Sequence, residues 1–500
     1  MKKILSLDIF NINKNQNLTW PIGEESFKKL SQILLENYLL LIEKNKKFIK
    51  LFQSETAFIN TLIQIYHIQI IKKILIENKF KIINGKYSKP FYDIENKLFE
   101  FKKLSIPQLL KLIIKSFLFT VKSNNIKNYL FLLKNHKSLC IGKPTKSVLE
   151  YSKRKKTFLF VVDTFQIDTN ISDSLDNSLI QNINNFFDDV DKEIKNYFNI
   201  DISSKKIKQN YLKRLNIIQQ NIYKNTLFNF DYVFTNSSKP IYKIFSLKHK
   251  NKNNKLCAQE HGNNRYSILN NFLPILYSGF DMFLCSNQKS KKNFEKLVNL
   301  NKHLKSNLPK SINMNIKKIK QNLIEKKINK NNLKILLVGY PMSPIRSPIA
   351  PNSFFYFKYY LEINILKLFK NYNYSIDYKI HPDRLGWQYS IKKYADKIVN
   401  DKFEKIYLDY DLVLFSYSHT STFNYFLKSN LPCIIFNTDL AAWNKNDLKY
   451  LYKRCHIERV SSNKNNKSCL PLLDFKRFQK MLEGAIKKKN NSDYFQKVVR

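Results

Sequence analysis

The sequence predicts an α/β protein with two α/β units and a mainly helical N-terminal part. Short apolar runs that end in Asp, Asn, Ser or Gly alternate with helical stretches, first from about residue 136 and again from residue 333. Near-continuous apolar strands of this kind are typical of parallel sheets that are buried on both faces. The 500 residues, 43% of them hydrophobic, suffice for two or three domains with substantial cores.

Residues 1–135 are predicted to be the mainly helical N-terminal part of the first domain, after a short strand at 3–8. Apolar residues recur at helical spacing between Leu109 and Val121, with lysines between them. We favour a helix that packs on the core and exposes its lysines to solvent. A helix that binds a membrane surface is the alternative.

The first α/β unit is predicted to span 136–299 and the second 333–470. A linker or surface segment, 300–332, is rich in Lys and Asn and joins them, and 471–500 are expected to be C-terminal helices. Helical stretches are expected at 180–227, 354–371 and 420–430. The strands are expected at 138–142, 158–164, 231–236, 256–259 and 281–287 in the first unit, and at 333–341, 375–382, 409–416 and 432–439 in the second.

The formal net charge of +47 raises the alternative of a non-catalytic protein that binds polyanions or nucleic acid. Only nine of the 86 Lys and Arg residues are Arg, which leaves 77 Lys spread along the whole chain. Proteins that read bases depend on Arg, because its planar guanidinium matches guanine and phosphate bidentately. We therefore attribute the net charge to the lysine-rich composition of the whole chain and expect no specific nucleic-acid partner. Attraction to an anionic membrane surface stays open.

The six cysteines have no zinc-site spacing, and three of them (Cys257, Cys285 and Cys433) lie in strand-like apolar runs, where a buried free thiol is expected. The N-terminus lacks the features of a signal peptide, and no run of 18 uncharged apolar residues occurs. These features predict a cytoplasmic protein, with peripheral association at the inner face of the cytoplasmic membrane left open.

Two clusters of unusual residues follow strands of the second unit. His381 directly follows a strand in "KIHPDRLGW", and Arg384 is close to it, so the two are candidates to hold a phosphate. Five hydroxyl residues lie between a strand and a helix in "SYSHTSTFNYFL". Helix capping requires one hydroxyl, so we favour phosphate binding by Thr420, Ser421 and Thr422 over capping alone.

A third cluster, "QEHG", follows the strand at 256–259 in the first unit. His261 is suited to take a proton from a hydroxyl near neutral pH, and Glu260 is a candidate to orient its imidazole. Gly262 permits a tight turn close to a ligand. The alternative is a surface turn with a solvated histidine and carboxylate.

The order of these clusters, His-Gly, then "KIHP", then the hydroxyl cluster before "LPCIIF", resembles bacterial GT-B transferases of surface polysaccharides. These transferases include teichoic-acid polymerases, capsular Kdo transferases and sialyltransferases. The sequence is most similar to an uncharacterised group of surface-carbohydrate transferases. The resemblance covers roughly 230–460. It implies two Rossmann-like domains of GT-B type, with the helical N-terminal part as an elaboration.

The resemblance also implies a function and a site. A sugar or polyol phosphate would pass from a nucleotide-activated donor, CMP-, CDP- or UDP-linked, to a hydroxyl of a glycan or lipid-linked acceptor. His261 would be the general base, and His381 with the hydroxyl cluster would hold the donor phosphates. No bound metal or other cofactor is implied, and we find no Asp-x-Asp at a plausible strand end. Tyr425 stands near the position at which many of these enzymes have a ribose-binding glutamate.

Overall fold

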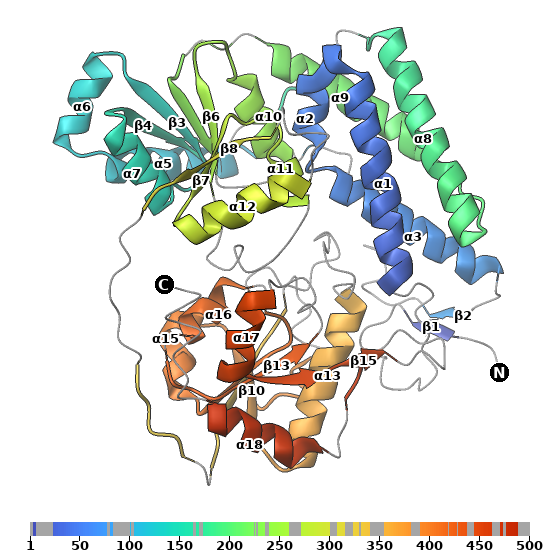
Figure 1. Ribbon diagram of the computed structural model, residues 1–500, viewed down its shortest axis with the longest axis vertical. Coiled ribbons are helices and arrows are strands. Elements are labelled where there is room, and N and C mark those ends of the chain that lie inside the picture. Colours follow the sequence, from blue (N-terminus) through green and yellow to red (C-terminus); the bar gives the residue numbers. More distant parts are fainter. Residues whose placement is uncertain are drawn as a thin grey trace.

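Two six-stranded parallel sheets, one above the other in Figure 1, form the framework of this computed structural model, with a layer of long helices beside the first sheet. The protein is thus a mixed α/β protein, and its architecture is compatible with two Rossmann-like domains. The structure describes residues 4–6, 24–77, 81–83, 101, 105–163, 167–169, 174–224, 226, 229–235, 240–259, 272–300, 308–315, 324–329, 332–340, 355–381, 391–418, 420–427, 429–437, 445–462, 471–473 and 477–488.

The first sheet has the strand order β4-β3-β5-β6-β7-β8, and each neighbouring pair is parallel. The five strands predicted for the first unit are confirmed as β3 to β7. Their apolar side chains are buried in cores on both faces of the sheet, as expected for parallel strands. The strands are β3 (Lys137–Ile141), β4 (Phe158–Val162), β5 (Tyr232–Thr235), β6 (Lys255–Gln259), β7 (Met282–Cys285) and β8 (Lys310–Asn313).

The strand β8 corrects the prediction for 300–332. That segment was expected to be a linker or surface segment, but its residues 310–313 pair with β7 and complete the sheet. Among the described residues of this segment, the buried apolar ones are Leu308 and Met314, which flank β8, and the strand itself, "KSIN", carries no apolar run. Its backbone hydrogen bonds to β7, rather than buried side chains, place it in the sheet.

Helices of the N-terminal part pack with two helices that lie between β4 and β5 in the sequence. The predicted helical stretch 180–227 divides into two helices because Asn199 adopts a left-handed conformation, with φ of 53°, and ends the first. Figure 1 shows these helices together as one layer. They are α1 (Glu24–Lys44), α2 (Ile49–Glu55), α3 (Ile59–Glu77), α8 (Asn177–Phe198) and α9 (Lys205–Tyr223), with a 3-10 turn at Lys46–Phe48 and a two-stranded parallel pair, β1 (Ile4–Ser6) and β2 (Lys81–Ile83).

A buried ion pair ties this helical layer together. The guanidinium of Arg214 on α9 donates two hydrogen bonds to the carboxylate of Glu55 at the end of α2, and both side chains are almost completely buried. The guanidinium also stacks between the rings of Phe58 and Phe101, at 4.1 and 4.5 Å from their centroids. The bidentate geometry and the aromatic contacts offset the cost of burying the two charges.

His67 makes the stability of the helical layer depend on pH. It belongs to α3, and its ring lies edge to face against the ring of Phe27 on α1. Burial lowers the pKa of His67 from 6.5 to about 3. Below about pH 6.5 the unfolded chain therefore binds a proton that the folded chain does not, and stability falls as the pH falls. We expect this histidine to cost about 2 kcal/mol of unfolding free energy between pH 8 and pH 5.

Denaturant titrations of the wild type and of His67→Gln at the two pH values measure this cost. The loss between pH 8 and pH 5 should be about 2 kcal/mol smaller in the variant, because other titrating groups cancel in the difference. The same pH dependence in His67→Gln and wild type would contradict the assignment.

The second sheet has the order β11-β10-β9-β12-β13-β14 and is also parallel throughout. In sequence order this is 3-2-1-4-5-6, the strand order of the Rossmann fold. The predicted parallel arrangement of the four strands near residues 335, 378, 413 and 434 is confirmed. The strands are β9 (Ile335–Val338), β10 (Ile376–Lys379), β11 (Ile398–Val399), β12 (Leu412–Phe415), β13 (Cys433–Asn437) and β14 (His456–Arg459).

Helices cover both faces of the second sheet. On one face, α13 (Phe355–Asn371) and α18 (Phe478–Lys488) pack on Leu337 and Ile434, and on the other face α15 (Phe403–Ile406), α16 (Ser421–Phe426) and α17 (Lys445–Arg454) pack on Leu336 and Val413. A 3-10 turn, Tyr407–Asp409, follows α15, and β15 (Ser461–Ser462) pairs antiparallel with β16 (Pro471–Leu472). Of the predicted C-terminal helices at 471–500, α18 lies in the described residues.

Around the first sheet lie α5 (Ile106–Ser123), α6 (Ile126–Leu133), α7 (Lys146–Arg154), α10 (Pro240–Lys248), α11 (Phe272–Leu276) and α12 (Gln288–Leu300). The helix α5 corrects the prediction that its apolar face packs on the core. None of its residues is buried, and the side chains of Ile114, Phe117 and Leu118 are 60%, 66% and 49% exposed.

The predicted thiols Cys257, Cys285 and Cys433 are confirmed as buried cysteines that form no disulfide within the described residues. In the described part of the chain, none of the helices has the length and apolar character needed to cross a membrane.

Candidate functional site

The carboxyl edges of the two sheets face each other. An ion pair joins the units, with 2.6 Å between Nζ of Lys289 and Oδ1 of the almost fully buried Asp447. Lys289 lies at the start of α12, just after β7, and Asp447 lies at the start of α17, which follows β13 in the chain. Figure 1 shows α12 on the side of the first unit that faces the second, and α16 and α17 on the opposing side. Ligands of open α/β sheets bind beyond the carboxyl ends of the strands, and the Lys289–Asp447 ion pair joins helices that begin at these ends of the two sheets.

The second sheet reverses its strand order between β9 and β12, and this switch point is where such sheets bind ligands. Gly339 and Tyr340 follow β9 there, and Ser416, Tyr417 and Ser418 follow β12. The rings of Tyr340 and Tyr417 meet edge to face with centroids 5.0 Å apart, so the two loops contact each other.

A buried polar network holds the switch point in place. The carboxylate of Glu362 on α13 is fully buried and accepts three hydrogen bonds. The donors are the backbone N–H of Tyr340 at 2.5 Å, the hydroxyl of Tyr378 at 2.6 Å and the hydroxyl of Ser416 at 2.9 Å. One carboxylate thus fixes the ends of three adjacent strands, β10, β9 and β12.

A buried cation completes this network. Lys358 lies one turn before Glu362 on α13 and is 1% exposed. Its ammonium donates to the carbonyl oxygen of Ser416 at 3.0 Å and lies 5.5 Å from the ring centroid of Tyr340. Lys358 therefore contacts both loops of the switch point, through the carbonyl oxygen of Ser416 and the ring of Tyr340.

Gly339 is required by close packing. A Cβ atom at this position would lie 2.0 Å from the hydroxyl oxygen of Tyr378, the same hydroxyl that donates to Glu362. A larger residue would displace that hydroxyl and disturb the network. The sequence does contain a signal for this site, a rare glycine directly after the strand "LLV", together with Lys358 and Glu362 four positions apart on the helix that follows.

His381 is two residues beyond the last residue of β10, at the same carboxyl edge, and is partly exposed. The strand β9 separates β10 from β12, so their ends lie about 10 Å apart, a span of the size of a nucleotide. Lys379, at the end of β10, is largely buried, and burial lowers its pKa while Asp401 and Glu404 oppose that effect. The predicted phosphate ligand Arg384 lies outside the described residues.

For Thr420, the capping interpretation is confirmed. Its hydroxyl oxygen accepts the backbone N–H of Thr422 at 3.2 Å and so caps α16, which has six residues. Thr422 is partly buried, and Ser421 is the first residue of the helix. Phosphate binding by the three residues stays a prediction. Tyr425, on the same helix, is 37% exposed.

The predicted catalytic group Glu260, His261 and Gly262 lies outside the described residues, but the strand that leads to it is well defined. The strand β6 ends at Gln259, which is fully buried and contacts the hydroxyl of Thr145 at the start of α7. Within the described residues, Nε2 of Gln259 has no hydrogen-bond partner. Glu260 follows directly, so the motif begins at the carboxyl edge of the first sheet, which faces the second unit.

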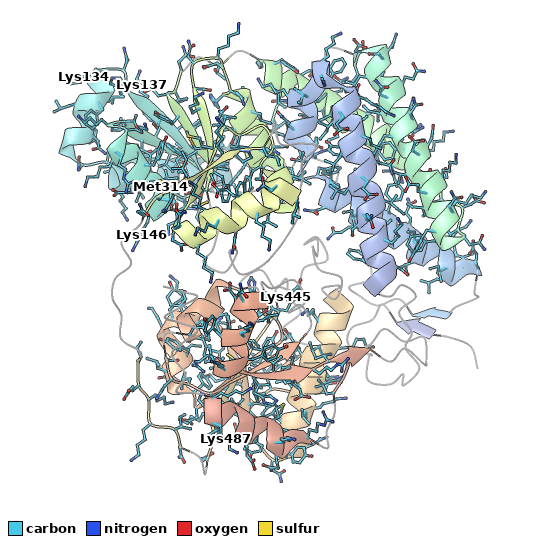
Figure 2. All side chains as sticks on the ribbon, viewed as in Figure 1. Lys134, Lys137, Lys146, Met314, Lys445 and Lys487 are labelled. Atoms are coloured by element: carbon cyan, nitrogen blue, oxygen red, sulfur yellow. The ribbon has the colours of Figure 1, made fainter. Side chains whose placement is uncertain are left out.

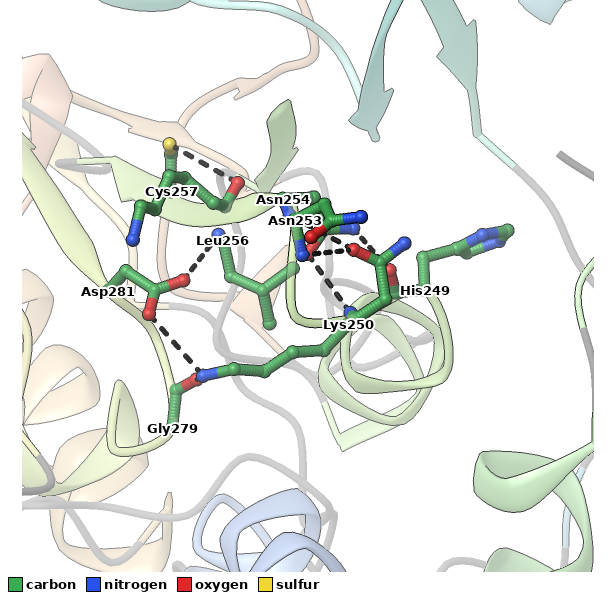
Figure 3. Close-up of polar contacts among 10 residues, drawn as sticks. His249, Lys250, Asn253, Asn254, Leu256, Cys257, Gly279 and Asp281 are labelled. Carbon is green, nitrogen blue, oxygen red and sulfur yellow. Dashed lines mark hydrogen bonds and ion pairs between the residues drawn. The ribbon is translucent and has the colours of Figure 1, made fainter. Parts of the chain in front are cut away.

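Polar contacts fix the opposite, amino end of β6 (Figure 3). The carboxylate of Asp281 accepts the backbone N–H of Leu256 at 2.7 Å. Lys250 donates to the carbonyl oxygen of Gly279 at 2.8 Å and lies 3.5 Å from the same carboxylate. These contacts set the register of β6 against β7 and therefore the point at which the histidine motif leaves the sheet.

No protein-family model matches the chain, and no curated protein matches it. The class that the fold defines is an α/β protein with two parallel, Rossmann-like units.

Proposed function

We propose that this protein is a GT-B-type transferase. It moves a sugar or polyol phosphate from a nucleotide-activated donor to a hydroxyl acceptor in bacterial surface-glycan biosynthesis. The observation that carries the proposal is that two parallel sheets turn their carboxyl edges toward each other across one interface, which the Lys289–Asp447 ion pair bridges. Such an arrangement lets one sheet hold the donor and the other supply the catalytic base.

The donor lies at the second sheet in this proposal. Its phosphates are held by His381, Arg384 and the hydroxyls of Thr420, Ser421 and Thr422. Glu362 and Lys358 fix the loops that follow β9 and β12. Cationic groups and backbone N–H groups stabilise the phosphate that leaves, so no metal is assigned a role. Gly262 lets the backbone of the first unit come close to the reacting atoms.

The base lies at the first sheet. His261 takes the proton of the acceptor hydroxyl while the acceptor oxygen forms a bond to the transferred group. The bond between that group and the nucleotide phosphate breaks at the same centre, and the nucleotide leaves with the electron pair. Glu260 holds the imidazole in the required orientation. The acceptor is a glycan or a lipid-linked glycan.

Turnover with a panel of donors tests the proposal. The protein is incubated with CDP-, CMP-, UDP- and GDP-linked donors, with and without membrane lipid extracts as a source of acceptor, and free nucleotide is measured. One donor class should release nucleotide faster when acceptor is present. Saturable binding of polyanions with no binding of any nucleotide donor would instead favour the non-catalytic alternative.

The double variant Ser421→Ala, Thr422→Ala should weaken nucleotide binding by about 1–3 kcal/mol, the scale of hydrogen bonds lost to a charged group. The unfolding free energy should change little, because Thr420 caps α16 and remains. Thr420→Ala is the informative comparison, since loss of the cap should cost about 0.5–2 kcal/mol of stability. Unchanged nucleotide affinity in the double variant would remove these hydroxyls from the donor site.

A further inference from the structure

The polar side of α5 faces the protein. Side chains spaced four residues apart accept the backbone N–H groups along the free side of the edge strand β4. The hydroxyl of Ser116 accepts from Asp163, that of Thr120 from Val161, and the amide oxygen of Asn124 from Leu159, at 2.9–3.0 Å. The helix thereby satisfies the unpaired backbone groups of the sheet edge, and it uses polar residues to do so.

The apolar side of α5 is consequently exposed to solvent. We call it the α5 stripe, and it consists of Ile106, Leu110, Ile113, Ile114, Phe117, Leu118 and Val121, each at least 43% exposed. Three more exposed apolar residues follow on α6, namely Tyr129, Leu130 and Leu133. Ten of the twenty large apolar side chains that are exposed in the described residues thus lie between Ile106 and Leu133. A concentration of this kind marks a surface that binds something apolar.

The charges around the stripe select the kind of partner. Exposed Lys111 and Lys122 lie on α5 itself, whereas Lys115 between them is ion-paired with Asp163. A pocket adjoins the C-terminal end of α5, and its lining includes Lys146, Lys153 and Arg154 together with one carboxylate, Glu150. Figure 2 shows Lys134 and Lys137 at the outer end of the first unit, next to α6. A second copy of the chain would bring like charges together, whereas an anionic bilayer supplies both an apolar interior and negative headgroups.

We propose that the α5 stripe docks this protein on an anionic lipid bilayer. The helix lies flat in the interface, with its apolar side chains in the acyl boundary and its lysines among the headgroups. Its 18 residues span about 27 Å along the surface. This inference concerns docking alone and stands whether or not the protein is a transferase, so its test uses no nucleotide.

Flotation of the full-length protein with vesicles tests the docking. One set of vesicles is phosphatidylcholine alone, and the other contains about one third phosphatidylglycerol. The wild type should bind the anionic vesicles, and binding should weaken as salt is raised. Ile114→Ser, Phe117→Ser and Leu118→Ser combined should lower the affinity about a hundredfold, since three inserted side chains are lost.

A matched control uses apolar residues that are equally exposed but lie elsewhere. Leu40, Ile76 and Leu300 are 49%, 71% and 59% exposed, and their combined change to Ser should leave vesicle binding unchanged. Lys111→Gln with Lys122→Gln retains every apolar contact and should still lower the affinity for anionic vesicles about thirtyfold at low salt, which keeps the test independent of how the triple variant folds.

Equal binding of the stripe variant and the control variant would overturn the proposal, as would equal binding of the wild type to neutral and anionic vesicles. Self-association that the stripe variant abolishes, in the absence of vesicle binding, would assign the stripe to a second copy of the chain and overturn it as well.

Discussion

Replacing His261 by alanine is expected to lower turnover by about 10²- to 10⁴-fold, the usual scale for loss of a general base. Donor affinity should be nearly unchanged, because the proposed phosphate ligands belong to the second sheet. The prediction depends on the strand β6, which ends at Gln259 on the edge that faces the second unit. Steady-state turnover and donor titration measure the two quantities.

Three further variants separate the assigned roles. His381→Ala should weaken donor binding as well as turnover, because this histidine is assigned to the donor phosphates. Glu260→Gln should have an intermediate effect on turnover if the carboxylate orients the imidazole. His136→Gln is the control, since His136 immediately precedes β3 at the opposite edge of the first sheet. A folded His261→Ala protein with near wild-type turnover would remove this residue from the mechanism.

Replacing Glu362 by alanine is expected to cost about 3 kcal/mol or more of unfolding free energy in the second unit. The change removes the acceptor of three hydrogen bonds, two of them from buried side-chain hydroxyls, and each unsatisfied buried group costs about 1–3 kcal/mol. The same carboxylate holds the loops after β9 and β12, so nucleotide affinity should also be lost. Denaturant titration and nucleotide titration measure the two effects.

Glu362→Gln should cost less, because the amide oxygen can still accept from Tyr340 and Ser416, and only the contact with Tyr378 needs a new arrangement. Glu483→Ala, at an exposed position on α18 of the same unit, is the control and should change stability by less than about 0.5 kcal/mol. Wild-type stability in Glu362→Ala would show that the network does not hold the switch point.

The sequence predicted the central strands of both sheets and missed three strands at their edges. The strands β8, β11 and β14 each have only one neighbour in their sheet. An edge strand need not bury both faces, so "KSIN", the two residues of β11 and "HIER" lack the apolar run that identifies a central strand. The fourth edge strand, β4, was predicted. It differs from the other three because α5 covers its free edge.

The helix α5 shows a different limit of sequence analysis. Its periodicity indicated an apolar face correctly, but periodicity does not specify what that face contacts. The deciding observation is that Ser116, Thr120 and Asn124 accept hydrogen bonds from β4, which turns the apolar side outward. That pairing joins residues about 40 positions apart and is not visible in local sequence.

In the candidate site, the positions of residues that directly follow strands could be predicted from the sequence. The position of His381 after β10 and of Thr420 before α16 follows from the rule that parallel strands present their carboxyl ends at one edge. The contact of Glu362 with Ser416 could not be predicted, because it joins a helix to a strand end 54 residues away.

The central claim is that a nucleotide-activated donor binds at the carboxyl edge of the second sheet. Hydrogen exchange with and without nucleotides tests this claim most directly. CMP, CDP, UDP and GDP are each added at saturating concentration to the full-length protein, and backbone protection is mapped. At least one nucleotide should protect the carboxyl ends of β9, β10 and β12, around residues 339–340, 380–381 and 416–422, and Glu362→Ala should abolish that protection. Protection of these segments by none of the four nucleotides, in a protein whose second unit is folded, would contradict the claim.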